Sequence, residues 1–265
     1  KQKFIEYNFV DVLILKKLDE KFKYLDLTKN ISHKGKTLYE DVYQSSKTQD
    51  GVISACLLNE GVIPPNRDPN PIVKKNYAGG YLFCPKTGIF NYMFDEDLTS
   101  LYPSIIMSLN IGRETLIGRI VTSNDRDNRL ALNDLKEMDP LDKFEVENLE
   151  RKSITMSVGE IIKLIEQNDL AITANGTMFR TDKPSTLSVV LSKWFDERVE
   201  YKNAMKKAYK SGDKVGGDLN HLRQYTMKIL LNSLYGATAL PNFRYGSVLL
   251  SEGITLTGQR IIQDS

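Results

Sequence analysis

Apolar side chains recur at intervals of three or four residues in several parts of the chain, with polar residues between them. This spacing places the apolar positions on one face of a helix, so it predicts amphipathic helices. The predicted helical stretches are residues 11–27, 156–167, 187–210 and 218–234. A polar stretch, residues 28–36, follows the first of them. The last two are joined by the polar, glycine-bearing segment 211–217, which predicts a helical hairpin.

Aromatic and β-branched residues gather in two short runs, residues 81–83 and 89–94, on either side of a Pro-Lys-Thr-Gly turn. Such runs predict a hairpin or a pair of adjacent strands. A short helix is expected further on, at residues 104–109. The proline cluster at residues 64–71 favours an extended, exposed linker. Helices and strands together predict a mixed α/β chain.

The chain has 265 residues, of which 41% are apolar and 26% charged, so it can bury a sizeable core. Its longest apolar runs are too short to cross a bilayer, which argues against a membrane partner. Two cysteines, Cys56 and Cys84, in a chain with no signal-like start indicate a reducing, intracellular compartment. The formal charge of +2 points to no particular partner, while the charge-dense, net acidic residues 123–152 predict an exposed insertion. Because the first residue is Lys1, we expect a segment of something longer.

A carboxylate precedes a predicted turn and helix at residues 97–104, Asp-Leu-Thr-Ser-Leu-Tyr-Pro-Ser. We expect Asp97 to follow an apolar strand and Pro103 to lie in the first helical turn, where its missing N–H costs nothing. The free N–H groups of a helix start bind anions, and a neighbouring carboxylate can hold a metal ion. Phosphate with Mg²⁺ is the natural ligand of such a site. The residues alone equally allow Asp97 to be a simple capping residue.

Cations recur along the first helix of the predicted hairpin. Arg198, Lys202 and Lys206 lie four residues apart, which places three positive charges on one stripe. A stripe of this kind fits a polyanion, but a solvated face with intrahelical ion pairs is the commoner alternative. The acidic neighbours available for such pairs are Asp196, Glu197 and Glu200.

The second helix of the hairpin carries a cation, an amide and an aromatic ring on one face. Lys228, Asn232 and Tyr235 fall at i, i+4 and i+7, and Gly236 leaves room for a close, flat partner. The alternative is a helix that ends at the glycine, with Tyr235 as a half-buried core residue.

Taken in order, these segments resemble the motifs of the family B (alpha-like) DNA polymerases. Residues 97–104, with Ser-Leu-Tyr-Pro-Ser intact, are similar to motif A, and residues 228–236 are similar to motif B, Lys-x-x-x-Asn-Ser-x-Tyr-Gly. Residues 77–80 resemble the Tyr-x-Gly-Gly element between the exonuclease and polymerase modules, and residues 7–11 resemble exonuclease motif III, Tyr-x-x-x-Asp. Residues 110–115 and 243–245 look most like the replicative polymerases of large tailed bacteriophages.

The resemblance implies a mixed α/β (α+β) fold: part of a polymerase palm sheet, a helical-hairpin fingers subdomain and a remnant of an RNase H-like exonuclease domain. The implied divisions are residues 1–68 for the C-terminal part of the 3′–5′ exonuclease domain and a connector, 69–184 for the first part of the palm with the acidic insertion, 185–240 for the fingers and 241–265 for the start of the return to the palm. It also implies template-dependent addition of dNTPs to a primer 3′ end, with two Mg²⁺ ions. Primer-template DNA would be the partner, joined in the complete enzyme by a sliding clamp and other replisome proteins. If the protein is viral, the compartment would be the host cytoplasm.

Each matched residue inherits a role from this resemblance. Asp97 would be the catalytic metal ligand, with the carbonyl of Leu98 beside it, and Tyr102 would pack under the sugar and exclude a 2′-hydroxyl. In the exonuclease site Asp11 would bind metal and Tyr7 would orient the attacking water, although Asp11 could also cap a helix. The other nucleotide contacts would be Ser100, Leu101, Arg198, Lys202, Lys228 and Asn232. The base-pair pocket would be lined by Ile229, Ser233, Tyr235 and Gly236, and DNA would contact Tyr77, Gly79 and Gly80.

One departure from the family pattern limits what this chain is expected to do. The Asp-Thr-Asp of motif C does not occur in these residues. Two ions about 3.5–4 Å apart need more than one carboxylate, so we expect the chain alone not to polymerise DNA. Three alternatives stay open: a non-catalytic polymerase-like module that binds nucleotides or single strands, a protein-primed family B polymerase, and an unrelated nucleotidyltransferase. Residues 113–181 are long enough for the insertion of a protein-primed enzyme, but their acidic character does not favour it.

Overall fold

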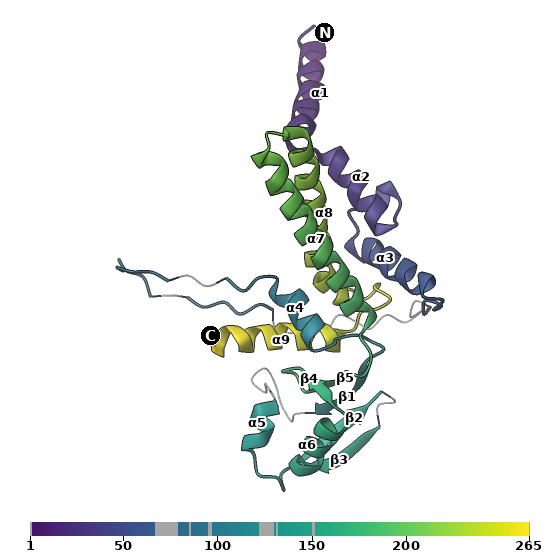
Figure 1. The fold of residues 1–265 in the computed structure, drawn as a ribbon, viewed down its shortest axis with the longest axis vertical. Helices are drawn as coiled ribbons and strands as arrows, with labels where there is room; N and C mark the ends of the chain where they lie inside the picture. The colour runs from purple at the N-terminus through teal and green to yellow at the C-terminus, as the bar shows by residue number, and fades with distance from the viewer. Residues whose placement is uncertain are drawn as a thin grey trace.

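The computed structural model describes residues 2–66, 79–84, 86–94, 97–121, 130, 132–149 and 152–264. Its helices are α1 (Gln2–Phe22), α2 (Tyr24–Gly35), α3 (Ser45–Asn59), α4 (Leu101–Ser108), α5 (Leu132–Glu137), α6 (Val158–Gln167), α7 (Thr186–Lys210), α8 (Lys214–Thr238) and α9 (Val248–Asp264), with a short 3-10 helix, η1 (Tyr39–Asp41), after α2. Its strands are β1 (Leu116–Val121), β2 (Lys143–Asn148), β3 (Ser153–Ser157), β4 (Leu170–Ile172) and β5 (Thr177–Arg180). The long helices and the sheet lie at opposite ends of the molecule (Figure 1). The predicted mixed α+β fold is confirmed.

The strands of the described chain form one antiparallel sheet in the order β3-β2-β1-β5-β4, and α6 packs against it. Ile120, Leu135 and Ile161 are fully buried between the sheet and its helices, so this part has a core of its own. Gly118 is required where β1 pairs with β2, because a Cβ there would lie 2.7 Å from the carbonyl oxygen of Glu147.

The stretch predicted as an exposed insertion, residues 123–152, is mostly exposed in its described part, but it also forms α5 and β2, and Leu135 is fully buried. Along β2 the charged residues alternate with Phe144 and Val146, which are half-buried. The charge density therefore reflects the solvent side of a strand. The helix predicted at residues 156–167 begins at Val158, because Ser157 ends β3 and caps α6 in a reciprocal capping box with Glu160.

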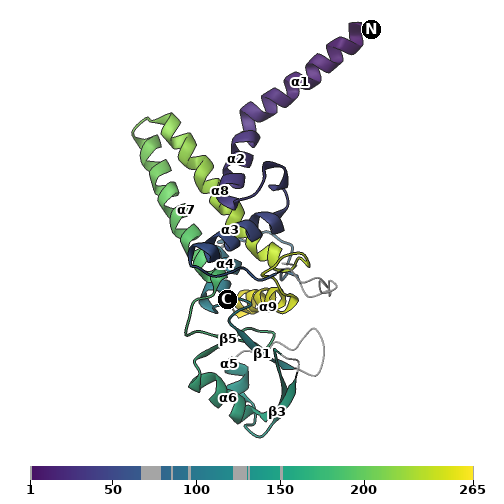
Figure 2. The ribbon, with the colours of Figure 1, turned by 90° about the vertical axis from the view of Figure 1, so that its right-hand side faces the viewer.

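The predicted helical hairpin is confirmed as α7 and α8, which run side by side (Figures 1 and 2). Ser185 and Asp213 cap the two helices with their side chains, and Gly212 makes the turn with a φ of 80°. The base of the hairpin packs into the main core through apolar residues of both helices and of α3, α4 and α9. Its fully or almost fully buried members include Leu187, Leu191, Met227, Leu230, Leu231 and Leu234.

The N-terminal helix differs from its prediction in both bounds. It begins at Gln2 and breaks at Lys23, whose φ of 55° is left-handed, so the predicted stretch 11–27 spans two helices. The polar stretch 28–36 continues as α2 because Thr28, Ile31 and Gly35 are buried against neighbouring elements. Packing here overrides weak helix propensity. α1 has no buried residue and projects away from the body (Figure 2).

The strands predicted at residues 81–83 and 89–94 are absent from the described residues there. Several of their apolar side chains are almost wholly exposed, 95% for Leu82 and 101% for Ile89, so no core formed by the described residues supports a strand here. The apolar strand expected before Asp97 is likewise not formed by the described residues. The helix after it is confirmed but begins earlier, at Leu101, and Pro103 lies in its first turn. The predicted linker 64–71 is described only as far as Asn66, without helix or strand.

No helix among the residues described above combines the length and the apolar character needed to cross a membrane.

Candidate active site

The start of α4 presents the residues of the motif A resemblance. Ser100 has a left-handed φ of 54°, which turns the chain sharply into the helix, and the N–H of Ser104 donates to its carbonyl at 2.9 Å. In the first turn Pro103 has no N–H, and the N–H groups of Leu101 and Tyr102 have no acceptor within the helix, which suits them to bind an anion. Asp97 and Leu98 are exposed immediately before this turn. Asp97 forms no ion pair with another described residue, so its carboxylate is accessible.

The ring of Tyr102 joins motif A to motif B. It stacks on the ring of Tyr235 in α8, with centroids 4.2 Å apart and planes inclined by 26°. Burial, with a smaller contribution from Tyr235, raises the pKa of the Tyr102 phenol above its ordinary value. The hydroxyl of Tyr235 shares a hydrogen bond of 2.7 Å with Thr255 Oγ1 of α9. Two segments far apart in sequence are thus held in direct contact.

Helix α9 and two glycines, Gly79 and Gly80, enclose Tyr102 from other sides. A Cβ at Gly258 would lie 3.0 Å from its ring, and a Cβ at Gly80 would lie 3.4 Å from its hydroxyl. Gln259 donates a hydrogen bond to the carbonyl of Gly79. Gly79 and Gly80 therefore lie at this site, whereas Tyr77 falls outside the described residues.

The cations of the hairpin carry no ion pairs within the described part of the chain. Lys202 and Lys228 are exposed, and Arg198 is half-buried, with its Nε buried and without a hydrogen-bond partner. The intrahelical pairs of the alternative prediction do not form among the described residues, and Glu197 instead binds Lys34 of α2 at 2.5 Å. The positive charge of α7 and α8 is therefore free to bind an anionic ligand. Lys206 is also exposed, and nothing in the structure gives it a role.

The face of α8 described by the motif B resemblance is partly open. Asn232 and Gly236 are exposed, and nothing lies within 4 Å of a Cβ built at Gly236. Ile229 is half-buried against the core. Ser233 is also half-buried, and its hydroxyl accepts a hydrogen bond from Gln49 of α3.

The residues matched to the exonuclease lie on α1, far along the chain from this stack. Tyr7 and Asp11 are both exposed. Asp11 lies in the middle of α1, so the alternative in which it caps a helix is wrong.

A magnesium site would be incomplete in this part of the protein. Among the described residues no group of three or more His, Cys, Asp or Glu side chains could hold a metal ion. Asp97 and the Leu98 carbonyl are suitable oxygen ligands for Mg²⁺.

Two helices that touch Tyr102, Tyr235 and Ser233 carry residues that local motifs did not identify. Gln49 of α3 gives no local signal, because a single polar residue in a helix is ordinary. Ser251, Thr255 and Gly258 of α9 are small and fall at i, i+4 and i+7, a spacing that indicates a closely packed helix face. That pattern could have predicted α9.

A helix start preceded by an exposed carboxylate and a cation-bearing helical hairpin thus meet at an aromatic stack, in a chain that also carries a small antiparallel sheet. The sequence model of DNA polymerase family B matches residues 38–265. The chain belongs to that family.

Known relatives agree. The chain is 27% identical to the DNA-directed DNA polymerase of Escherichia phage RB69 and 26% identical to that of Enterobacteria phage T4, in both cases over 99% of this chain and 31% of the relative. It is 26% identical to a DNA polymerase of Orf virus (strain NZ2), over 83% of this chain and 20% of the relative. The fold is similar to the family B DNA polymerase of Pyrobaculum calidifontis, with a TM-score of 0.59 and 18% identity over 93% of this chain and 26% of that one. The chain thus spans about a third of the length of its phage relatives.

Proposed function

We propose that this chain is the central part of a DNA polymerase that adds dNTPs to the 3′ end of a primer on a DNA template. The observation that carries the proposal is the Tyr102–Tyr235 stack, because it brings the helix start after Asp97 and the hairpin helix with Lys228 to one place. An enzyme of this kind needs a carboxylate and cations on the same triphosphate.

The residues divide the work of binding by their chemistry. The free N–H groups at the start of α4, around Ser100 and Leu101, suit the triphosphate oxygens. Arg198, Lys202 and Lys228 would neutralise the outer phosphates, with Asn232 in support. Because the triphosphate would contact the start of α4 and the α7–α8 hairpin at once, both are needed to bind it.

The stacked rings would select the nucleotide. Tyr102 is held between Tyr235 and Gly258, so its ring cannot move aside for a ribose 2′-hydroxyl. Ile229, Ser233, Tyr235 and Gly236 would line the base-pair pocket, with the open space at Gly236 facing the flat bases. Gly79, Gly80 and the preceding Tyr77 would contact the DNA.

Asp97, with the Leu98 carbonyl, would hold Mg²⁺, which when bound supplies charge neutralisation at the reacting phosphate. The second carboxylate of a two-ion site would come from elsewhere in the complete polymerase, so this chain alone would not extend a primer. Asp11 and Tyr7 would belong to the exonuclease site. The proposal also includes the four domain divisions given above, a sliding clamp and other replisome proteins as partners, and a location in the host cytoplasm.

The test is Asp97→Asn in the complete polymerase. Asparagine keeps the shape of the side chain and removes its charge, so we expect primer extension to be abolished while the thermal unfolding transition is unchanged. A protein-primed enzyme would require a terminal protein rather than a primer in the same assay. Full extension by Asp97→Asn would refute the metal role, and no extension by the unmodified enzyme would favour a non-catalytic module.

A further inference from the structure

The side-chain amide of Gln49 in α3 lies in the core and forms hydrogen bonds with α8, the helix that carries motif B. Gln49 is fully buried, and its Nε2 donates to the Leu230 carbonyl at 2.9 Å and to Ser233 Oγ at 2.7 Å. Ser233 Oγ in turn donates to the same Leu230 carbonyl at 3.1 Å. The three groups form a closed triangle across the α3–α8 contact.

The turn of α8 that Gln49 contacts, from Leu230 to Ser233, lies among the residues that we assign to nucleotide binding. Leu230 follows Lys228 and Ile229, and Ser233 lies between Asn232 and Tyr235. Because a helix is rigid over one turn, fixing the Leu230 carbonyl and the Ser233 hydroxyl fixes the rotation of the whole turn. The contact with α3 on the buried side of α8 therefore fixes the orientation of its exposed side, which carries Lys228 and Asn232.

A buried glutamine is energetically unfavourable if its only role is to fill space in the core. Its Oε1 is buried and has no hydrogen-bond partner among the described residues. An unpaired buried acceptor is unfavourable, and an apolar side chain of similar volume would avoid that cost. What the amide adds is direction, because two hydrogen bonds define a position more narrowly than apolar contact does.

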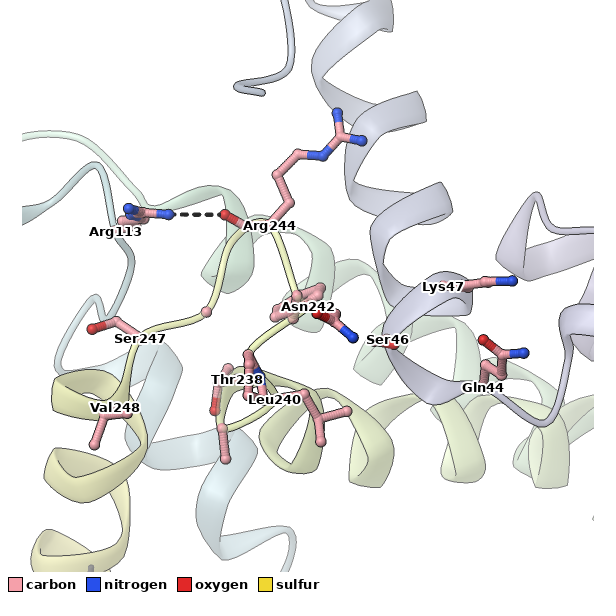
Figure 3. A pocket seen from close by; sticks show the side chains of 14 residues that line it. Gln44, Ser46, Lys47, Arg113, Thr238, Leu240, Asn242, Arg244, Ser247 and Val248 are labelled. Atoms are coloured by element: carbon pink, nitrogen blue, oxygen red, sulfur yellow. Dashed lines mark hydrogen bonds between the residues drawn. The ribbon is translucent and has the colours of Figure 1, made fainter. Parts of the chain in front are cut away.

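α3 is itself fixed to the chain that follows α8. Asp50, next to Gln49, forms an ion pair with Arg244 at 3.2 Å, and Ser54 Oγ shares a hydrogen bond of 2.8 Å with Tyr245. Figure 3 shows the Arg244 side chain extending beside α3, while Arg113 donates to the Arg244 carbonyl at 3.2 Å. The support behind Gln49 is thus tied at several points.

We propose that Gln49 is a positioning residue for nucleotide binding, acting through Leu230 and Ser233 on the face of α8 that carries Lys228 and Asn232. The inference rests on the proposed function, since it assumes that this face binds the dNTP. It adds to motif B a residue that lies on a different element and touches no substrate.

The test is Gln49→Met in the complete polymerase, which keeps the volume and removes both hydrogen bonds. We expect KM for the correct dNTP to rise about tenfold, equivalent to roughly 1.4 kcal/mol, with kcat little changed. The matched control is Thr28→Val, which removes a buried hydroxyl and its 3.3 Å contact with Tyr43 away from this triangle. It should leave KM unchanged. A merely structural role would lower the active fraction, and so kcat, without moving KM.

A second variant keeps the inference testable if Gln49→Met does not fold. Ser233→Ala removes one corner of the triangle. Because Ser233 is also assigned to the base-pair pocket, the readout for this variant is the amide exchange of Leu234, which should quicken as it does in Gln49→Met. Where both fold, the double variant should cost less than the sum of the two, because both changes break one network. Independent effects of the two changes, or a KM for Gln49→Met equal to that of the control, would overturn the inference.

One readout does not depend on catalysis. In the helical pattern of α8 the N–H of Leu234 donates to the Leu230 carbonyl, which also accepts from Gln49. Hydrogen exchange of the Leu234 amide should therefore be faster in Gln49→Met and unchanged in Thr28→Val. Unchanged exchange at Leu234 would overturn the inference even if the enzyme proved inactive. Absence of primer extension by the unmodified enzyme, with the exchange effect present, would instead count against the proposed function.

Discussion

Replacing Gly236 by alanine should separate the stability of α8 from its function. Gly236 lies in the last turn of α8 and is exposed, and a Cβ built on it meets nothing within 4 Å. Its backbone φ is not among the left-handed values of the chain, so alanine can adopt the same conformation. The folded structure therefore offers no steric objection to Gly236→Ala.

The expected gain in stability follows from backbone entropy. Alanine is favoured over glycine inside a helix by about 0.5–1 kcal/mol, and a position in the last turn should give the lower end of that range. The expected effect on function has the opposite sign. If the open space at Gly236 receives the nascent base pair, a methyl group there overpacks the complex by about 1–3 kcal/mol. That corresponds to a loss of about 5- to 150-fold in kcat/KM.

Two measurements test this pair of expectations. Urea unfolding should show a higher midpoint with an unchanged slope, and single-nucleotide primer extension by the complete polymerase should show the lower kcat/KM. Gly258→Ala is the matched control, because its Cβ would lie 3.0 Å from the Tyr102 ring, which the stack on Tyr235 holds in place. That control should lower stability. A Gly236→Ala enzyme with ordinary extension would refute the use of this space, and a destabilised one would refute the helix geometry.

Three further predictions concern other parts of the chain. Tyr102→Ala should relax the exclusion of ribonucleotides, measured as the ratio of dNTP to NTP incorporation; an unchanged ratio would remove the steric assignment. Arg198→Ala should raise the dNTP concentration needed for extension by about tenfold, as expected for one charge-assisted contact of roughly 1.4 kcal/mol, and an ordinary dNTP response would return Arg198 to a solvated face. The hydrogen bond from the Ser157 backbone N–H lowers the pKa of Glu160 below its ordinary 4.5, so its contribution to stability is present above pH 4.5 and is lost as the pH falls through the lowered value. Acid unfolding followed by circular dichroism should show this loss and should show less of it in Glu160→Gln.

Elements that make their own local contacts were predictable from the sequence. The hairpin of α7 and α8 follows from apolar spacing and a glycine-bearing turn, and its caps Ser185 and Asp213 are residues that commonly begin helices. The helix start at residues 101–108 follows from the position of Pro103. These features depend on neighbours within one or two turns, so the local pattern contains the information.

Elements that depend on a distant partner were not predictable in the same way. The run at residues 89–94 has strand composition but forms no strand with the described residues, because β-propensity expresses fit to a neighbouring strand more than a preference of the backbone. The reverse holds at β2: its charged residues gave no strand prediction, yet it forms a strand because it pairs with β1 and β3. In both cases the deciding contact lies in another part of the chain.

The same distinction explains why motif residues were found and the residues behind them were not. Tyr102 and Tyr235 belong to recognisable motifs, but they stack because α9 places Gly258 against one ring and Thr255 against the hydroxyl of the other. α9 is also tied to the sheet, since Asn175 donates to the Leu249 carbonyl at 3.0 Å. A side chain larger than glycine at position 258 would displace Tyr102 without altering either motif. Motif residues therefore define what the site can bind, whereas the small residues of α9 decide whether its two halves meet.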